Sequence, residues 1–342
     1  MITDASLQRI TLLRARADRK IAGLAFAGSA RHLRDGCRYV MRGGGKRIRP
    51  TLVLLSCEAV GGGAAAALDA AVAVEMMHNF TLVHDDIMDN ADARRGRPTV
   101  HKKWNPSTAL LVGDVLLGEA YRILGRTRSG RLPALFQIFT RGLLHVCEGQ
   151  ALDLEFETRT DVSVREYFRM IEKKTGSLIA AATELGGVIG GGTTRQRAAL
   201  RQFGLALGRA FQVQDDLLDV VADPRNFGKT TGGDILEGKK TYLLLTAATR
   251  VTGRDRALIA RLLAGGGFRA GWKTAGGRVT EAGRIMVDAA TGAYRRHGVL
   301  DDARRVVRRA TAEALGSLRR LPASPAREAL RRLAEDLVTR AS

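Results

Sequence analysis

The pattern of apolar and polar positions along the 342 residues is that of helices almost throughout. Apolar residues recur every three to four positions among good helix formers, which is the spacing expected of packed α-helices. The predicted helices cover residues 52–59, 68–88, 108–124, 132–154 and 164–185. No sustained alternation of apolar and polar residues is flanked by tight turns, so we expect no strands. The pattern therefore predicts an all-α protein.

Glycine and proline mark the connections between these helices. They cluster at 43–45, 61–63, 190–192, 223–224 and 265–267. No connection is long and polar enough to be a flexible tether between domains. A basic amphipathic region follows at 303–340, where Pro322 and Pro325 interrupt the helical pattern. We expect a single all-α domain over residues 1–342.

The positive charge of the chain raises the question of its partners. Lys and Arg number 55 against 35 Asp and Glu, which gives a formal net charge of +20. Nucleic acid, an anionic membrane and polyanionic small molecules are the partners that such a charge attracts. Only 5% of the residues are aromatic, and no zinc-finger, RNP or basic-zipper pattern occurs, so we expect no nucleic-acid partner. We interpret the arginines as a solvated surface, with weak attraction to membrane surfaces as a by-product.

Cysteine usage and hydropathy indicate a cytoplasmic protein. Cys37, Cys57 and Cys147 are too few and too far apart for a disulfide framework, and no pair has zinc-ligand spacing. No run of about 18 apolar residues could form a membrane-spanning helix. Charged side chains interrupt residues 1–19, so we expect no secretory signal there.

Two acidic clusters are the first candidates for chemistry. They contain Asp85, Asp86 and Asp89 in one case and Asp215, Asp216 and Asp219 in the other. In each cluster the outer aspartates are four positions apart, so on a helix they share one face. Like charges at this spacing destabilise a helix, which indicates a compensating cation. Oxygen ligands with nothing softer nearby favour Mg²⁺, completed by water and substrate phosphates.

Cations in short blocks suggest what the metal accompanies. The candidates are Lys46, Arg49, Arg94, Arg95, Lys174, Lys229 and Lys239, with Thr175 beside Lys174. The glycine-rich turn at 43–45 lacks the order and the preceding strand of a P-loop, so an NTPase is not expected. Ammonium and guanidinium groups both bind phosphate oxygens. Acids that hold metal and cations that hold phosphate together indicate a diphosphate site.

The chain resembles the trans-isoprenyl diphosphate synthases, also called polyprenyl synthetases, over residues 43–245. The resemblance is carried by ordered blocks: GGGKRIRP (43–50), HNFTLVHDDIMD (78–89), RRGRPTVH (94–101), GD (113–114), KTGSL (174–178), FQVQDDLLD (211–219) and GKTTGGDILEGKKT (228–241). It implies an all-α bundle of helices around a central apolar cavity. It also implies a prenyltransferase that joins isopentenyl diphosphate to an allylic diphosphate (dimethylallyl, geranyl or farnesyl), and usually a homodimer.

The resemblance assigns roles to the candidate residues. The two aspartate clusters would face each other across the cavity and hold about three Mg²⁺ ions on the allylic diphosphate. That diphosphate would be bound by Arg94, Lys174, Lys229 and Lys239. Thr175 and Gln212 would lie close to the reacting carbon and its leaving oxygen. Isopentenyl diphosphate would be bound by Lys46, Arg49, His78 and Arg95, whereas His84 would be a supporting residue.

The mechanism implied is ionisation followed by alkyl transfer. Metal ions and fixed cations stabilise the departing diphosphate, and the apolar cavity tolerates the allylic cation. The double bond of isopentenyl diphosphate attacks the cation, and a proton then leaves to the departing diphosphate. No side-chain base is conspicuous in the sequence, which agrees with that route.

Product length is expected to depend on the helix that carries Asp85. In the family, the residues four and five positions before the first aspartate form a floor for the growing chain, and here they are Thr81 and Phe80. Phe80 would lie about 7.5 Å deeper than Asp85, with Met77 beyond it. One aromatic residue and no insertion in the aspartate motif favour a C20 product, geranylgeranyl diphosphate. The alternatives are that these residues are plain core, or that the product is C15, C25 or longer.

Rival functions fit the sequence less well. A class I terpene cyclase lacks the block at 43–50, and a non-catalytic subunit of a heteromeric synthase usually loses one aspartate cluster. Two departures from the family, Trp104-Asn105 and Tyr242, are expected to touch no proposed ligand. The helix at 132–154 is our expected dimer interface.

Overall fold

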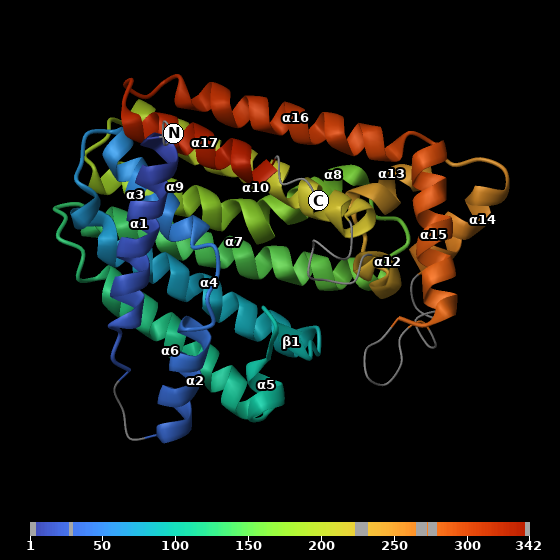
Figure 1. The fold of residues 1–342 in the computed structure, drawn as a ribbon, viewed down its shortest axis with the longest axis horizontal. Coiled ribbons are helices and arrows are strands. Elements are labelled where there is room, and N and C mark those ends of the chain that lie inside the picture. The colour runs from blue at the N-terminus through green and yellow to red at the C-terminus, as the bar shows by residue number, and fades with distance from the viewer. Residues whose placement is uncertain (1–4, 27–29, 223–231, 265–271, 273–278, 339–342) are drawn as a thin grey trace. The chain divides into compact units, whose positions relative to one another are not determined.

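The computed structural model describes residues 5–26, 30–222, 232–264, 272 and 279–338. The chain divides into two compact units, and each is described by itself. The first unit contains residues 1–144, 178–204 and 316–333, and the second contains 145–177, 205–315 and 334–342. The prediction of an all-α fold is confirmed, because helices dominate both units (Figure 1). The prediction of a single domain stays a prediction.

The first unit is built on one buried helix, α4. Its elements are α1 (Ala5–Ala22), α2 (Arg31–Met41), α3 (Ile48–Ala59), η1 (Ala64–Ala67), α4 (Leu68–Met88), β1 (Ala93–Arg94), β2 (Arg97–Pro98), α5 (Val100–Lys103) and α6 (Pro106–Leu124). Most positions of α4 before Phe80 are buried, which is the mark of a central helix rather than a surface one. It packs against α3 and along α6.

The start of α6 is fixed by local chemistry. The side chain of Asn105 accepts a hydrogen bond from the backbone N–H of Thr108, and Pro106 occupies the first helical turn. Both are favoured at a helix N-terminus, because they satisfy or remove otherwise unpaired N–H groups. Asn105, one of the residues at which the chain departs from the family pattern, is therefore the N-cap of α6.

Five further helices in the described ranges contain residues of both units. They are α7 (Leu132–Thr158), α9 (Ser177–Ile189), α10 (Thr194–Val221), α16 (Val299–Leu318) and α17 (Pro325–Val338). The expected break of the C-terminal region lies between α16 and α17, with Pro325 as the first residue of α17. Among the described residues, no helix is both long enough and apolar enough to cross a membrane.

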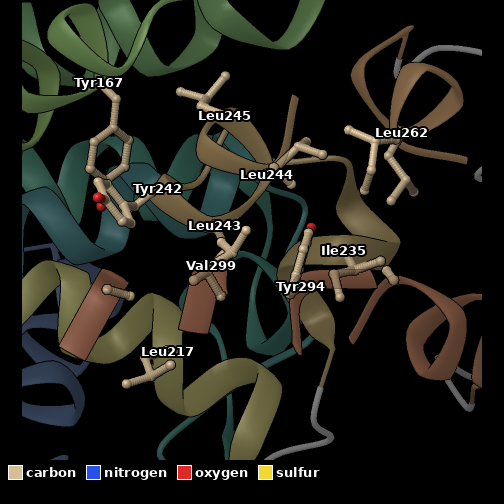
Figure 2. Packing of buried hydrophobic residues seen from close by; sticks show 14 of the residues in the cluster. Tyr167, Leu217, Ile235, Tyr242, Leu243, Leu244, Leu245, Leu262, Tyr294 and Val299 are labelled. Carbon is tan, nitrogen blue, oxygen red and sulfur yellow. The ribbon is translucent and has the colours of Figure 1, made fainter. Parts of the chain in front are cut away.

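The second unit encloses a cluster of aromatic and aliphatic side chains. Its own elements are α8 (Val164–Ile171), η2 (Glu172–Gly176), α12 (Gly233–Glu237), α13 (Tyr242–Arg250), α14 (Arg254–Ala264) and α15 (Glu281–Arg296). Figure 2 shows part of the cluster, with Tyr167 from α8 beside Tyr242 from α13. The centroids of these two rings are 6.1 Å apart. A capping box, Ser163 with Glu166, starts α8.

Two local features differ from the sequence prediction. Ala93–Arg94 pairs with Arg97–Pro98 as a short antiparallel hairpin, so the expectation of no strands was wrong at this point. The predicted helix over 164–185 is divided by the π-helical segment η2. The turns at 43–45, 61–63 and 190–192 connect helices as expected, whereas those at 223–224 and 265–267 lie outside the described residues.

Candidate active site

The first aspartate cluster lies at the C-terminal end of α4. Asp85 and Asp89 are one turn apart, half-buried and exposed respectively. Asp86 is buried, and its Oδ1 accepts a hydrogen bond of 2.6 Å from Nε of Arg94. Burial raises the pKa of Asp86, and the charge of Arg94 opposes that shift. Asp85 and Asp89 are therefore the more exposed carboxylates of this cluster, while Asp86 orients Arg94.

The short hairpin brings two cationic blocks together. Arg95 lies at its tip in the left-handed region with φ 53°, and its guanidinium donates to the carbonyl oxygen of Gly44. Gly45 has φ 132°, and a Cβ there would lie 3.0 Å from that guanidinium. The positive φ therefore favours glycine at this position. The contact unites the blocks at 43–50 and 94–101, which are far apart in the sequence.

His78 lies within this cationic group as a neutral ring. Its Nε2 is 3.1 Å from Nη1 of Arg49, and a guanidinium can only donate, so Nε2 accepts. Burial lowers the pKa of His78 well below its usual value, and the charges of Arg49 and Arg95 lower it further. Lys46 is exposed on the turn that precedes Arg49. Arg49, His78 and Arg95, predicted as ligands of one diphosphate, are thus brought together in the first unit.

A buried ion pair that the sequence did not reveal supports this region. Arg47, between Lys46 and Arg49, donates to Oε1 of Glu75 at 2.7 Å and to Oδ1 of Asp18 at 2.8 Å. Arg47 has φ 46° and precedes the first turn of α3. The pair therefore fixes the backbone that carries the predicted phosphate ligands, and nothing in the local pattern distinguishes Arg47 from its neighbours.

An open pocket adjoins Asp86 of the first cluster. Asn79, Leu82 and Asp86 line it from α4, and Arg94 and Arg95 line it from the hairpin. Apolar and cationic groups therefore surround one space. That combination suits a small ligand with an anionic head and an apolar tail.

Of the residues predicted to limit product length, Met77 and Phe80 are buried in the packing of α4 and Thr81 is half-buried. Met77 is fully buried, and the Phe80 ring meets His84 edge to face at a centroid distance of 4.7 Å. Thr81 donates its hydroxyl to the carbonyl oxygen of His78. A Cβ on Gly113 of α6 would lie 2.2 Å from Nε2 of His84, which explains the glycine of the GD block. The role of these residues in product length stays a prediction.

The second aspartate cluster lies on α10, and its middle member is the most constrained. Asp216 is 3% exposed. Its Oδ2 accepts from the hydroxyl of Tyr167 at 2.6 Å and from the backbone N–H of Tyr242 at 3.1 Å. Its Oδ1 accepts from Nε2 of Gln212 at 3.2 Å. Our expectation that Tyr242 touches no proposed ligand was therefore wrong.

Asp215 and Asp219 flank that buried residue. Asp215 is exposed, whereas Asp219 is half-buried and accepts a hydrogen bond of 3.0 Å from the backbone N–H of Asp234. Burial raises the pKa of Asp219, and the nearby charge of Asp234 raises it further. This local excess of negative charge is the setting in which a bound cation would be stabilising.

Lys174 and Thr175 occupy the π-helical segment η2. Nζ of Lys174 lies 2.6 Å from Oδ2 of Asp153 on α7, and the Thr175 hydroxyl donates to Oε1 of Gln212 at 2.8 Å. A Cβ on Gly149 would lie 2.2 Å from the backbone N of Lys174, so α7 and η2 approach closely only because position 149 is glycine. Such π-helical turns are rare and often occur at functional sites.

An open pocket in the second unit is lined by several of these groups. Of the predicted residues, it is lined by Lys174, Gln212, Asp216 and Lys239. Sequence reasoning missed three of its acidic or phenolic neighbours, Asp153, Tyr167 and Asp234. Asp234 lies inside the family block at 228–241, so a signal existed for it, whereas Asp153 and Tyr167 fall outside every block. Lys239 contacts Glu237 at 3.1 Å, and Lys229 lies outside the described residues.

The donor set fits Mg²⁺ that arrives with a diphosphate. Within the described ranges, no group of three or more His, Cys, Asp or Glu side chains forms a ready-made metal cage. Each cluster instead offers carboxylate oxygens one helical turn apart beside cationic side chains. Mg²⁺ is commonly bound in this way, by one or two carboxylates together with substrate phosphates and water.

Comparison with known proteins identifies the family of the chain. The polyprenyl synthetase family model matches residues 30–269. The chain is 39% identical over 303 residues, 88% of each chain, to the short chain isoprenyl diphosphate synthase of Methanothermobacter thermautotrophicus. It is 44% identical over 212 residues, 61% of this chain and 65% of the relative, to the geranylgeranyl diphosphate synthase of Methanosarcina mazei.

Solved structures give the same result. Geranylgeranyl pyrophosphate synthetase from Pyrococcus horikoshii matches with a TM-score of 0.89 at 35% identity and covers 98% of both chains. Polyprenyl synthase from Caulobacter crescentus, solved with calcium and isoprenyl diphosphate, matches with a TM-score of 0.86 at 30% identity, over 99% of this chain and 98% of that one. This chain therefore belongs to the polyprenyl synthetase family and is a prenyltransferase.

Proposed function

We propose that the protein condenses isopentenyl diphosphate with an allylic diphosphate in a Mg²⁺-dependent reaction and forms all-trans geranylgeranyl diphosphate. The observation that carries the proposal is the same in both units. In each unit the middle aspartate of a cluster, Asp86 or Asp216, lines a pocket together with cationic side chains, and the two outer aspartates lie one helical turn apart on either side of it in the sequence. Carboxylates beside cations are what a metal-bound diphosphate requires.

The four outer aspartates would hold the metal, and the middle ones would hold protein groups. When bound, Mg²⁺ neutralises charge on the departing diphosphate. Asp86 already accepts from Arg94, and Asp216 accepts three hydrogen bonds from protein donors. Arg94, Lys174 and Lys239, with Lys229, would bind the same diphosphate. Lys174 is held beside Asp153, so its ammonium is placed before the substrate arrives.

The second substrate would be bound in the first unit. Arg49 and Arg95 supply positive charge, with Lys46 on the adjoining turn. His78 is neutral, so it would contribute a hydrogen bond rather than a charge. Thr175 and Gln212 bond to each other and would lie next to the reacting carbon. The proton lost after attack would leave with the diphosphate.

Product length is the finer part of the proposal. Phe80 is held against His84, and Met77 is buried one turn further from Asp85. A C20 product follows if Phe80 is the floor of the chain cavity. C15, C25 and longer products are the alternatives, and the names of similar proteins include both geranylgeranyl and unspecified short-chain synthases.

The assembly we propose is a single-domain protomer in a cytoplasmic homodimer. Large apolar side chains that would benefit from a partner are exposed on α6 and α7. Leu111 is 51% exposed and Leu144 is 61% exposed. Leu144 lies within the helix expected to form the interface. The basic surface would add weak attraction to anionic membranes.

Product analysis tests the proposal. The purified protein is incubated with isopentenyl diphosphate, Mg²⁺ and dimethylallyl, geranyl or farnesyl diphosphate separately, and the dephosphorylated products are sized. We expect a C20 alcohol. A C15 or C25 alcohol would retain the reaction but move the floor away from Phe80. No product from any starter would refute the proposed activity and favour a subunit that needs a second chain.

A further inference from the structure

Tyr167 is a buried polar group that the assigned roles do not use. It comes from α8, outside every block that carries the family resemblance, and it is 2% exposed. Its ring packs among Phe168 and Tyr242, with centroid distances of 5.5 Å and 6.1 Å. Figure 2 shows it inside the apolar cluster of the second unit. A tyrosine buried in this way needs a partner for its hydroxyl.

The partner of that hydroxyl begins a chain of hydrogen bonds. Tyr167 donates to Asp216 at 2.6 Å, the shortest of the three bonds that Asp216 accepts. The other carboxylate oxygen accepts from Gln212, whose Oε1 in turn accepts from the hydroxyl of Thr175. A carboxylate can only accept, so Asp216 dictates that the amide nitrogen of Gln212 faces it and that the amide oxygen faces Thr175.

We propose that Tyr167 is a positioning residue, which fixes Asp216 and through it the orientation of Gln212 and Thr175. In this arrangement Asp216 is a buried anchor and not a ligand of the substrate metal. The inference rests on the proposed function, because the proposed function places Gln212 and Thr175 next to the reacting carbon. It predicts that loss of the Tyr167 hydroxyl slows the chemical step and leaves diphosphate binding unchanged.

The test compares Tyr167→Phe with the control Tyr121→Phe. Tyr121 also packs edge to face on an aromatic ring, and its hydroxyl bonds to Thr140 rather than to a site residue. Wild-type condensation is measured first, so that failure of the proposed function is recognised separately. In Tyr167→Phe we expect kcat to fall about tenfold to a hundredfold, as loss of a hydrogen bond to a carboxylate implies. KM for isopentenyl diphosphate should not change, and Tyr121→Phe should behave as wild type.

A second readout separates an anchor from a metal ligand. Binding of Mg²⁺ with inorganic pyrophosphate, measured by calorimetry, should have the same Kd in Tyr167→Phe and wild type. A third readout uses Thr175→Val, which removes the last hydroxyl of the chain. It should lower kcat similarly, and the double variant should be no slower than Thr175→Val alone, because both substitutions break one chain. If Tyr167→Phe folds poorly, Thr175→Val alone still tests the proposal, because an unchanged kcat in that variant would refute a role for the end of the hydrogen-bond chain.

Three results would overturn the proposal. An unchanged kcat in Tyr167→Phe would show that the hydroxyl only satisfies a buried carboxylate. A parallel loss of affinity for Mg²⁺ and pyrophosphate would show that Asp216 acts at the metal. Multiplicative effects of Tyr167→Phe and Thr175→Val would show that the two hydroxyls act independently.

Discussion

The Arg47–Glu75 pair allows a quantitative prediction about the scaffold under the isopentenyl diphosphate ligands. Both side chains are almost fully buried, at 4% and 3% exposure, and their closest atoms are 2.7 Å apart. Substitution Glu75→Leu leaves the guanidinium of Arg47 buried without its main counter-charge. Breaking a buried pair in this way typically costs about 3–5 kcal/mol.

The remaining partner of Arg47 lowers that figure. Asp18 still contacts Nε of Arg47, but its side chain is 48% exposed, so it compensates at most about 1 kcal/mol. We therefore expect Glu75→Leu to lower the free energy of unfolding by about 2–4 kcal/mol. The double variant Glu75→Leu with Arg47→Met also removes the buried guanidinium that has lost its partner. It should recover at least about 1 kcal/mol of the lost free energy of unfolding.

Urea unfolding followed by circular dichroism measures the free energies of unfolding of the single and the double variant. The control is Glu328→Gln on α17. Glu328 pairs with Arg331 at the surface, and such a pair contributes less than about 1 kcal/mol to the free energy of unfolding. KM for isopentenyl diphosphate should rise in Glu75→Leu, because Arg47 lies between Lys46 and Arg49. A loss of stability no larger than in Glu328→Gln would refute the reasoning.

Three further predictions concern product length, packing and pH. Phe80→Ala should yield products longer than the wild type by chromatography of the alcohols, and an unchanged product would assign Phe80 to plain core. Gly113→Ala should lower the thermal unfolding temperature, because its Cβ would lie 2.2 Å from Nε2 of His84, whereas Gly118→Ala on the same helix meets nothing within 4 Å and should be tolerated. His78 has a lowered pKa in the folded state. Its contribution to the free energy of unfolding is therefore fully present above its unfolded pKa of about 6.5 and is lost as the pH falls below that value. His78→Gln should flatten that acid loss in unfolding measurements, and an equal loss in the variant would contradict the assignment.

The helices could be predicted because their signal is local. The predicted helix at 68–88 coincides with α4, because its long run of apolar helix formers matches the burial of most of its positions. The π-helical segment at Glu172–Gly176 could not be predicted, because it interrupts a run of helix-forming residues without a glycine or proline at its start. The hairpin at 93–98 was missed because strands of two residues show no alternation.

Some residues of the candidate site could likewise be predicted from local patterns, and others could not. The aspartates and phosphate-type cations have recognisable types and spacings, and the structure groups them within each unit. Their buried partners carry no such signal. Tyr167 lies 49 positions from Asp216, and Glu75 lies 28 positions from Arg47. Only the fold shows that these side chains meet, and therefore that Asp216 accepts three hydrogen bonds from protein donors.

The central claim is that both aspartate clusters carry the condensation, and one measurement tests it most directly. The kcat of Asp85→Asn and of Asp215→Asn is compared with that of Asp301→Asn, an exposed aspartate on α16 that pairs with Arg304. Loss of a group that stabilises the departing diphosphate predicts a fall of about a hundredfold or more in each of the first two variants. Asp301→Asn should retain wild-type activity. Wild-type kcat in either Asp85→Asn or Asp215→Asn would contradict the account.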